Sequence, residues 1–358
     1  MSQDRDWLLK ALDLAQQRKG VTFPNPAVGA VVIKNGQVLG QGFHWGAGYP
    51  HAEVEALRGI QEEEARGATI YVTLEPCCHF GKTPPCSELL KEKKIKRVVY
   101  GYLDPNPKVS GKGAKALAQA GVKVEWVPLQ EIEVFYQSYS YWTRTGNTSL
   151  TGKLALSKNE VVASFDGRPI KITGQSADDY THLRRAQADA LLTSVTTVIK
   201  DDPQLNVRLG SSVLKKNVWI LDRRLRFPLD CQLMKSALSI TLVHGPTYET
   251  NRKEELIHAG LQCIEIREAS DQLILSDLAR ELGNKGFHEA WCEVGPKLFS
   301  EFSKAGLFQE IILYHSTQIE VANGKKAFDD EKELAFKNYK KVSEERLGPD
   351  LKESWNLK

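Results

Sequence analysis

The sequence predicts an α/β protein of two domains, and three observations support this prediction. Strand-like and helix-like segments alternate through both halves of the chain, which is typical of helices packed on a mostly parallel sheet. A length of 358 residues is enough to bury two hydrophobic cores. The polar stretch TRTGNTS at 143–149 separates the two patterns and has the composition of a linker. We therefore expect one domain at 1–145 and a second at 146–358.

In the first half, apolar side chains recur at helical spacing within residues 4–19. The stretch AVGAVVIKNGQVLGQGF predicts a hairpin that turns at Asn35-Gly36. Helices and strands then alternate, in the order helix HAEVEALRGI, strand GATIYVTLEP, helix CSELLKEKKI, strand RVVYGYLD, helix GAKALAQAG and strand VKVEWV. A polar and aromatic helix, LQEIEVFYQSYSYWTRTG, completes this domain.

The second half begins with the strand LTGKLALS and a helix at 176–187. It continues with strands ADALLTSV, NVWILD and ITLVHG, a helix at 273–285, the strand EAWCEVG, a short helix and the strand EIILYHS. No G-x-G-x-x-G motif follows a strand, so the fingerprint of a Rossmann dinucleotide site is missing. The two halves do not resemble each other, so the chain is not an internal duplication.

Charge and composition exclude several classes of protein. The 48 lysines and arginines nearly balance the 45 acidic residues, and the net charge of +3 argues against bulk binding of nucleic acid. No apolar run approaches the roughly 18 residues of a membrane span, and the N-terminal stretch lacks the apolar core of a signal peptide. We therefore expect a cytoplasmic protein without membrane or nucleic-acid partners. In that reducing compartment, cysteines serve metal binding or catalysis more often than disulfides.

Three residues of the first half form a candidate zinc site. His51 begins a predicted helix, Cys77 ends a predicted strand, and Cys86 begins another predicted helix. One imidazole and two thiolates leave a tetrahedral zinc ion with an open position, which distinguishes a catalytic site from a closed structural one. Zinc lowers the pKa of bound water to about 7, so hydroxide is available near neutral pH. Thiolates are also favoured at helix N-termini.

Glu53 lies two residues after His51 and is not needed as a ligand. The combination H-x-E with a later P-C pair is the arrangement of zinc nucleobase deaminases, in which the glutamate carries protons. Here eight residues, rather than two, separate the two cysteines. Within this loop, we expect Cys78 to be a small buried residue, and for His79 a substrate contact and a structural role both stay open. A structural zinc clip is the alternative for the whole group.

The motifs NPAVGAVVIKNG, GYPHAEVEAL, TLEPCCHFGKTPPC and DPNPKVSGKG together resemble the bifunctional deaminase–reductases of riboflavin biosynthesis. The resemblance continues in LRRAQADALLTSVTTVIKDDPQLNVR, CEVGPKLF and RLGPD, so it covers nearly the whole chain. It implies a cytidine-deaminase-like α/β/α sandwich followed by a dihydrofolate-reductase-like α/β domain. The first domain would use Zn2+ to deaminate 2,5-diamino-6-(5-phosphoribosylamino)pyrimidin-4-one. The second would use NADPH to reduce the ribosyl group to ribityl, and the chain would form a homo-oligomer.

The same resemblance implies roles for individual residues. Asn25 would line the pyrimidine pocket, although it is also a plain turn residue between two prolines. Cofactor contacts fall on Leu156, Thr197 and Asp201, and substrate contacts on Arg185, Leu205, Arg208 and Glu293. In EVGPKLF, a strand ends and a helix begins, and the backbone N–H groups of that first turn suit a cofactor phosphate. Gly295, Pro296, Lys297 and Leu298 form this helix start and are the predicted cofactor contacts, although proline itself has no N–H to donate. We expect Arg184 to be an ordinary solvated helix residue.

Three positions depart from the pattern of the family. Asn159 stands in place of an aspartate, Lys171 in place of a tryptophan, and Arg223 where a small hydroxyl residue is frequent. These changes put cofactor affinity in doubt and raise the alternative of an active deaminase with a degenerate reductase domain. Two further alternatives are a nucleic-acid base deaminase and a non-catalytic, zinc-stabilised binding protein.

Overall fold

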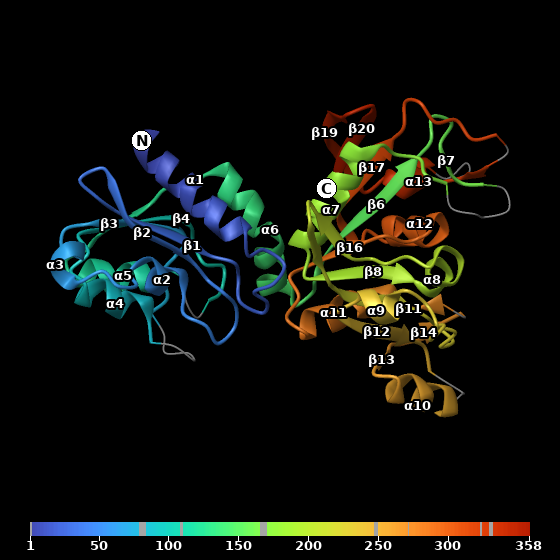
Figure 1. The fold of residues 1–358 in the computed structure, drawn as a ribbon, viewed down its shortest axis with the longest axis horizontal. Coiled ribbons are helices and arrows are strands. Elements are labelled where there is room, and N and C mark those ends of the chain that lie inside the picture. Colours follow the sequence, from blue (N-terminus) through green and yellow to red (C-terminus); the bar gives the residue numbers. More distant parts are fainter. Residues whose placement is uncertain are drawn as a thin grey trace. The chain divides into compact units, whose positions relative to one another are not determined.

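The chain divides into two compact units, Met1–Gly146 and Asn147–Lys358, each described here by itself (Figure 1). The computed structural model describes residues 2–78, 84–107, 110–164, 170–246, 250–270, 272–322, 324–328 and 332–358. The expected linker is shorter than its sequence suggests, because one helix continues to Thr145 and the next strand begins at Ser149. Among the described helices, none is both long and apolar enough to cross a membrane.

The first unit is built on a five-stranded sheet with the order β2-β1-β3-β4-β5. Strand β1 is antiparallel to β2 and β3, and β3, β4 and β5 are parallel to one another. The hairpin turns at Asn35-Gly36, as predicted, with both residues at positive φ. The strands are β1 (Gly29–Lys34), β2 (Gln37–Phe43), β3 (Thr69–Leu74), β4 (Arg97–Tyr102) and β5 (Lys123–Trp126).

Helices cover both faces of this sheet and confirm the expected α/β/α sandwich. One hydrophobic cluster joins α1 and α6 to one face, and a second joins α2, α4 and α5 to the other. The alternation along β1 shows why, since Ala30 and Val32 belong to one cluster while Val31 and Ile33 belong to the other. The helices are α1 (Ser2–Gln16), α2 (Ala52–Ala56), α3 (Glu62–Ala65), α4 (Cys86–Glu92), α5 (Lys112–Gln119) and α6 (Gln130–Thr145).

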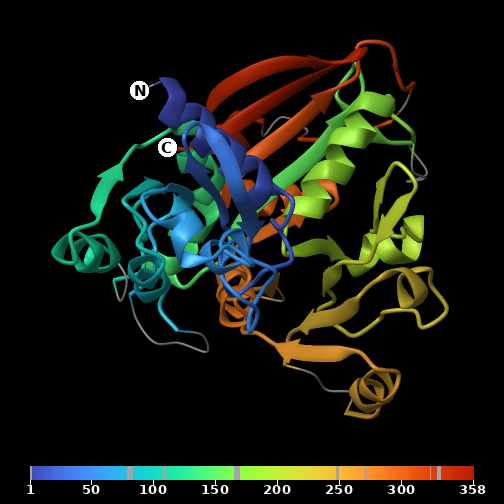
Figure 2. The same cartoon turned by 60° about the vertical axis from the view of Figure 1, so that its left-hand side comes forward.

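The second unit contains a nine-stranded sheet with the order β13-β12-β11-β8-β16-β6-β17-β20-β19. Strands β13 to β17 in this order are parallel, and the C-terminal hairpin adds β20 and β19 antiparallel at one edge. Figure 2 shows this red hairpin at one end of the unit and the gold-brown β13 and α10 at the other. The sheet strands are β6 (Ser149–Leu156), β8 (Ala190–Ser194), β11 (Asn217–Leu221), β12 (Ser239–His244), β13 (Gln262–Glu265), β16 (Glu289–Cys292), β17 (Phe308–His315), β19 (Tyr339–Leu347) and β20 (Asp350–Leu357).

The remaining elements of the second unit are helices and short strands around this sheet. The helices are α7 (Gln175–Gln187), α8 (Val195–Asp201), α9 (Leu233–Ser236), α10 (Thr250–His258), α11 (Leu275–Asn284), α12 (Pro296–Lys304) and α13 (Lys332–Phe336). The short strands are β7 (Val161–Ala163), β9 (Val207–Leu209), β10 (Ser212–Leu214), β14 (Glu268–Ala269), β15 (Gln272–Leu273) and β18 (Lys325–Lys326). The unit is therefore α/β, as predicted.

The strand order places a topological switch point between β8 and β16. From β8 the chain proceeds outward through β11, β12 and β13, and then returns to add β16 on the other side of β8. In open parallel sheets, ligands bind outside the carboxyl ends of the strands at such a point. The carboxyl ends of β8 and β16 are thus the place to look for a ligand in this unit.

Gly113 in α5 lies against the loop that follows β3. A Cβ atom at this position would lie 1.8 Å from the carbonyl oxygen of Pro76. Pro76 directly precedes Cys77, so the close approach of α5 fixes the backbone of a candidate metal ligand.

We expect Gly113→Ala to lower the free energy of unfolding by about 1–3 kcal/mol, because backbone atoms must move apart. Helix propensity alone would predict the opposite sign, since alanine is favoured over glycine within a helix. Thermal and urea unfolding would measure the change, with the exposed Lys115→Ala on the same helix as control. A Gly113→Ala variant as stable as the parent protein would contradict the close packing.

Candidate metal centre and active sites

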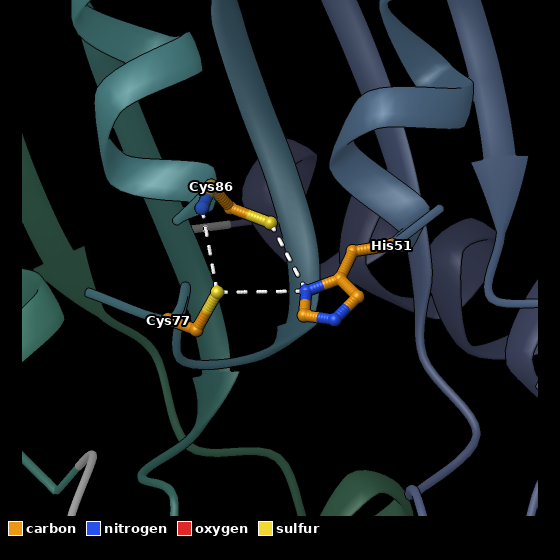
Figure 3. A group of neighbouring side chains, drawn as sticks. All are labelled: His51, Cys77 and Cys86. Atoms are coloured by element: carbon orange, nitrogen blue, oxygen red, sulfur yellow. Dashed lines mark hydrogen bonds between the residues drawn. The ribbon is translucent and has the colours of Figure 1, made fainter. Parts of the chain in front are cut away.

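The three candidate zinc ligands come from three elements and point toward one another (Figure 3). His51 is the N-cap residue of α2, Cys77 follows the carboxyl end of β3, and Cys86 is the first residue of α4. Proline precedes each of them, at Pro50, Pro76 and Pro85, and restricts the backbone at each approach.

The distances between the donor atoms suit a single zinc ion. Nδ1 of His51 lies 3.2 Å from Sγ of Cys86 and 3.5 Å from Sγ of Cys77, and all three donor atoms lie within 4.8 Å of one another. Tetrahedral zinc, with ligands at about 2.0–2.3 Å, needs donor atoms roughly 3.3–3.8 Å apart. The residues present therefore fit the metal that the sequence predicts.

The electrostatics of the group favour thiolate. The hydrogen bond with Cys86, together with those from His51 and from the Cys86 backbone N–H at 3.3 Å, holds the pKa of Cys77 at about 4. The interaction with Cys77 in turn raises the pKa of Cys86, which is fully buried. The pair thus carries one thiolate by itself, and binding of a cation favours loss of the second proton.

Glu53 lies one residue into α2 beyond Ala52, and its side chain is only 4% exposed. Burial raises the pKa of this carboxyl group, and the nearby Cys77 charge raises it further. A carboxyl group with a raised pKa can both accept and donate a proton near neutral pH. Among the described residues, the group that could hold a metal ion consists of His51, Cys77 and Cys86, without Glu53.

His51, Glu53 and Cys77 line a cavity of about 320 Å³. Asn25 lines the same cavity, as predicted, and its Nδ2 lies 3.0 Å from Nε2 of His44. Nδ1 of His44 lies 2.9 Å from the Pro50 carbonyl oxygen, so Nδ1 donates there and Nε2 accepts from Asn25. Burial lowers the pKa of His44, which keeps the ring neutral and holds the Asn25 amide in one orientation.

Sequence reasoning missed several lining residues, among them His44, Asp104, Asn106 and Tyr139. Oδ1 of Asp104 accepts hydrogen bonds from the Asn106 backbone N–H at 2.8 Å and from the Tyr139 hydroxyl at 3.3 Å. The available signal was the polar DPN stretch directly after the strand RVVYGYLD. Because β4 is parallel to its neighbour β3, the residues after both strands meet at one edge of the sheet.

The prediction for Cys78 is wrong. Its side chain is partly exposed rather than buried. Successive side chains of an extended segment point to opposite sides, so the orientation of Cys77 toward His51 turns Cys78 away from the site. His79 lies outside the described residues.

In the second unit, Arg185 and Glu293 form a bidentate ion pair. Nε and Nη2 of Arg185 donate to the two carboxylate oxygens of Glu293 at 2.6 and 2.9 Å. Trp291 Nε1 donates to the same carboxylate at 3.0 Å. Burial opposes ionisation, but the charge and hydrogen bonds of Arg185 outweigh it and lower the pKa of Glu293 to about 2. The pair therefore stays charged throughout the physiological pH range.

The other predicted reductase residues lie at or just beyond the carboxyl edge of the nine-stranded sheet. Leu156 ends β6, Thr197 lies in the first turn of α8 after β8, and Gly295 caps α12 after β16. A Cβ atom at Gly295 would meet nothing within 4 Å, so the space beside this helix start is open. Pro296, Lys297 and Leu298 form the first turn of α12, and Asp201 ends α8.

The segment Leu205–Arg208 lies beside the ion pair. Nη1 of Arg185 donates to the Asn206 carbonyl oxygen at 3.0 Å. Leu205 is buried at positive φ, while the exposed Arg208 donates to the Asn206 side chain at 3.2 Å. The structure thus brings the four predicted substrate residues Arg185, Leu205, Arg208 and Glu293 into one neighbourhood.

The prediction for Arg184 is wrong, and Lys153 was missed. Arg184 is not solvated, because it lies over the Trp291 ring and pairs with Glu289 at 3.1 Å and Glu310 at 2.8 Å. Lys153 lies in the middle of β6. Burial lowers its pKa, and the charge of Glu293 offsets only part of this effect. No sequence signal marks this lysine, because a single charged residue in a strand is ordinarily solvated.

Two of the departures from the family pattern have structural explanations. Asn159 closes a turn, since its Oδ1 accepts from the Ser157 hydroxyl at 2.8 Å and from Val321 N at 3.1 Å. Lys171 is exposed and pairs with Asp178 at 3.3 Å. Neither substitution leaves a gap or an unpaired charge in the described structure.

Comparisons with known proteins agree with this geometry. Residues 148–352 match the family described as RibD C-terminal domain, and residues 1–102 match the cytidine and deoxycytidylate deaminase zinc-binding region. Riboflavin biosynthesis protein RibD of Aquifex aeolicus is 37% identical over 88% of this chain and 87% of its own length.

Two solved structures are similar over the full chain. RibD of Acinetobacter baumannii has a TM-score of 0.85 at 34% identity and covers 100% of this chain and 99% of its own. A diaminohydroxyphosphoribosylaminopyrimidine deaminase/5-amino-6-(5-phosphoribosylamino)uracil reductase of Thermotoga maritima has a TM-score of 0.84 at 28% identity and covers 99% of each chain.

For the metal site, we expect Cys86→Ser to reduce zinc from about one ion per chain to a small fraction, because a hydroxyl is a poor zinc ligand. Metal analysis after dialysis against a mild chelator would measure this. The matched control is Cys78→Ser, which changes the same chemistry nearby but outside the donor set. Retention of zinc by Cys86→Ser, or its loss from Cys78→Ser, would contradict the assignment.

Proposed function

Because the chain belongs to the RibD family of bifunctional deaminase–reductases, we propose that the cavity at His51 is its deaminase site and the Arg185–Glu293 edge its reductase site. The chain is a zinc-dependent deaminase and an NADPH-dependent reductase of riboflavin biosynthesis. It acts on a phosphorylated pyrimidine. A degenerate reductase, a nucleic-acid base deaminase and a non-catalytic binding protein are not favoured by these relationships.

The observation that carries the deaminase assignment is the buried Glu53 beside the donor set of His51, Cys77 and Cys86. These three residues would hold zinc, which when bound lowers the pKa of a coordinated water toward neutrality. Glu53 takes a proton from the attacking water and delivers it to the departing amine. Burial raises the pKa of this carboxyl group, which strengthens it as a proton acceptor for the first of these steps.

Asn25 and the residues after β4 would position the pyrimidine. The His44 ring fixes the Asn25 amide, and the hydrogen bond from Tyr139 fixes the Asp104 carboxylate. Donors and acceptors held in one orientation discriminate between the edges of a heterocycle at little entropic cost. A cavity of about 320 Å³ is at the lower end of small-molecule sites and suits a single pyrimidine ring with its immediate substituent.

In the second unit, the proposed reductase site lies at the switch point between β8 and β16 and includes the Arg185–Glu293 ion pair. Arg185 and Arg208 offer cations for a substrate phosphate, and Glu293 holds Arg185 in place. The open first turn of α12 at Gly295 would receive a cofactor phosphate. We add Lys153 to this site, because its charge interacts with both members of the ion pair.

We also propose that the protein works in the cytoplasm as a homo-oligomer. The six cysteines are free, which suits a reducing compartment. Strand β19 ends the nine-stranded sheet, and in the described part of the chain it pairs on one side only, with β20. A second copy could add to that edge.

The deaminase assignment predicts that Glu53→Gln keeps its zinc but loses ammonia release by about 10²–10⁴-fold, because the amide cannot carry the proton. Parallel measurements of metal content and ammonia release from the diaminopyrimidine substrate would show this. Glu55→Gln, on the same short helix, should leave both quantities unchanged. Full activity in Glu53→Gln would remove Glu53 from the mechanism.

For the reductase, Glu293→Gln should reduce NADPH oxidation roughly a hundredfold, because Arg185 loses its charged partner and its fixed orientation. The substrate would be the deaminated ribosylaminouracil phosphate, so the assay does not depend on the first step. Ammonia release by the same variant serves as the internal control and should not change. Equal loss of both activities would point to general unfolding rather than to a site at Glu293.

A further inference from the structure

A second ion pair lies at the carboxyl edge of the second sheet, on the far side of β8 from Arg185 and Glu293. Arg223 follows β11, and Glu268 belongs to the short strand β14 that comes after β13. Nε of Arg223 lies 3.6 Å from a carboxylate oxygen of Glu268, and the two side chains are 24% and 21% exposed. Both groups are thus within reach of a ligand while being held near each other. Figure 1 shows β11, β12 and β14 close together in this unit.

Hydrogen bonds to Asp222 and from helix α10 hold the turn that carries Arg223. Asp222 is fully buried, and its Oδ2 accepts a hydrogen bond from the Phe227 backbone N–H at 2.8 Å. From α10, Arg252 donates to the carbonyl oxygen of Leu225 at 3.2 Å and also to that of Phe227. Leu225 and Phe227 belong to the hydrophobic core. The Arg223 guanidinium is therefore presented by a fixed turn.

The position of Glu268 is also constrained. A Cβ atom at Gly245, directly after β12, would lie 2.2 Å from a carboxylate oxygen of Glu268. The Gly245 backbone N–H bonds to the Arg223 carbonyl oxygen at 3.3 Å. The glycine leaves room for the carboxylate over the end of β12, beside the guanidinium. A side chain at this position would exclude it.

In the proposed reductase site, the pair lies on the side toward which the adenosine half of a dinucleotide would extend. With the pyrophosphate at the crevice between β8 and β16, the nicotinamide faces Lys153 and Glu293 on the β6 side. The adenosine half then extends in the opposite direction, over β8 toward β11 and β12. Strands are about 4.8 Å apart, so the end of β11 lies roughly 5–10 Å from that crevice, within reach of an adenosine ribose.

We propose that Arg223 and Glu268 set how strongly this chain distinguishes a dinucleotide with a 2′-phosphate from one with a 2′-hydroxyl, with Glu268 weakening that distinction. This inference rests on the proposed reductase site. The Arg223 cation attracts a 2′-phosphate, while the Glu268 carboxylate competes for the same cation and repels the phosphate dianion. A ribose 2′-hydroxyl, in contrast, donates a hydrogen bond to a carboxylate without any charge penalty.

The Glu268 carboxylate therefore changes the selectivity between a 2′-phosphate and a 2′-hydroxyl. Binding of a 2′-phosphate requires Arg223 to exchange Glu268 for the ligand, whereas binding of a 2′-hydroxyl does not. Specificity is a difference between two affinities, and a repulsive group changes it as effectively as an attractive one. Glu268→Gln removes the charge but keeps a carbonyl oxygen that can accept from a 2′-hydroxyl, so it should act on NADP+ and spare NAD+.

Binding of NADP+ and NAD+ to the full-length, zinc-loaded chain by isothermal titration calorimetry tests the proposal without any turnover. We expect Glu268→Gln to raise the ratio of the NAD+ to the NADP+ dissociation constant by about tenfold, through tighter NADP+ binding. Arg223→Gln should lower the ratio by about the same factor. Adenosine 2′,5′-bisphosphate and 5′-AMP should repeat both shifts as fragments, which locates the effect at the 2′ position.

The matched control is Glu265→Gln, the same charge change at the exposed end of β13. It should leave the ratio unchanged, and a shift equal to that of Glu268→Gln would overturn the proposal in favour of a general field effect. An unchanged ratio in Glu268→Gln, with normal binding by the parent chain, would overturn the selectivity role alone. Failure of the parent chain to bind either dinucleotide would overturn the proposed reductase site, and this inference with it.

Discussion

The first unit depends on one constraint: an imidazole nitrogen and two sulfur atoms must meet within bonding distance of a single ion. The ligands are 26 and 9 residues apart in sequence, and they meet because α2, the end of β3 and α4 share one edge of the sheet. The fold supports this at each approach. Prolines restrict the backbone before all three ligands, and Gly113 lets α5 press against the loop that carries Cys77.

How far sequence could predict this site follows from what sequence encodes. Residue chemistry and spacing were enough to predict the donor set and Glu53, since each lies next to a recognisable helix start or strand end. His44 and Tyr139 were beyond reach, because their roles depend on strand order and on the packing of α6, whereas Asp104 lies in the polar DPN stretch and could have been found. Cys78 was assigned to the core from the usual burial of free cysteine, but its neighbour's orientation decides its exposure.

In the second unit, sequence chemistry contributed less to the prediction than the family resemblance did. There, the residue roles came from the family resemblance, and the chemistry of single motifs was weak. One pattern could have been used: Glu289, Trp291 and Glu293 alternate along β16 and its extension, so they share one face. That face meets α7, whose adjacent Arg184 and Arg185 pair with two of its acids. Recognising this would have required knowing that α7 packs there, which periodicity alone does not give.

The Arg185–Glu293 pair is more informative about function than about stability. Moving two charges out of water costs several kcal/mol per ion in typical proteins, so apolar side chains of similar size would often serve a core as well. Here the carboxylate is satisfied further by Trp291, and the guanidinium by the Asn206 carbonyl oxygen. These contacts keep both charges fixed in orientation at the carboxyl edge of the sheet. A fixed, desolvated charge can position a phosphorylated substrate, whereas it adds little to the stability of a hydrophobic core.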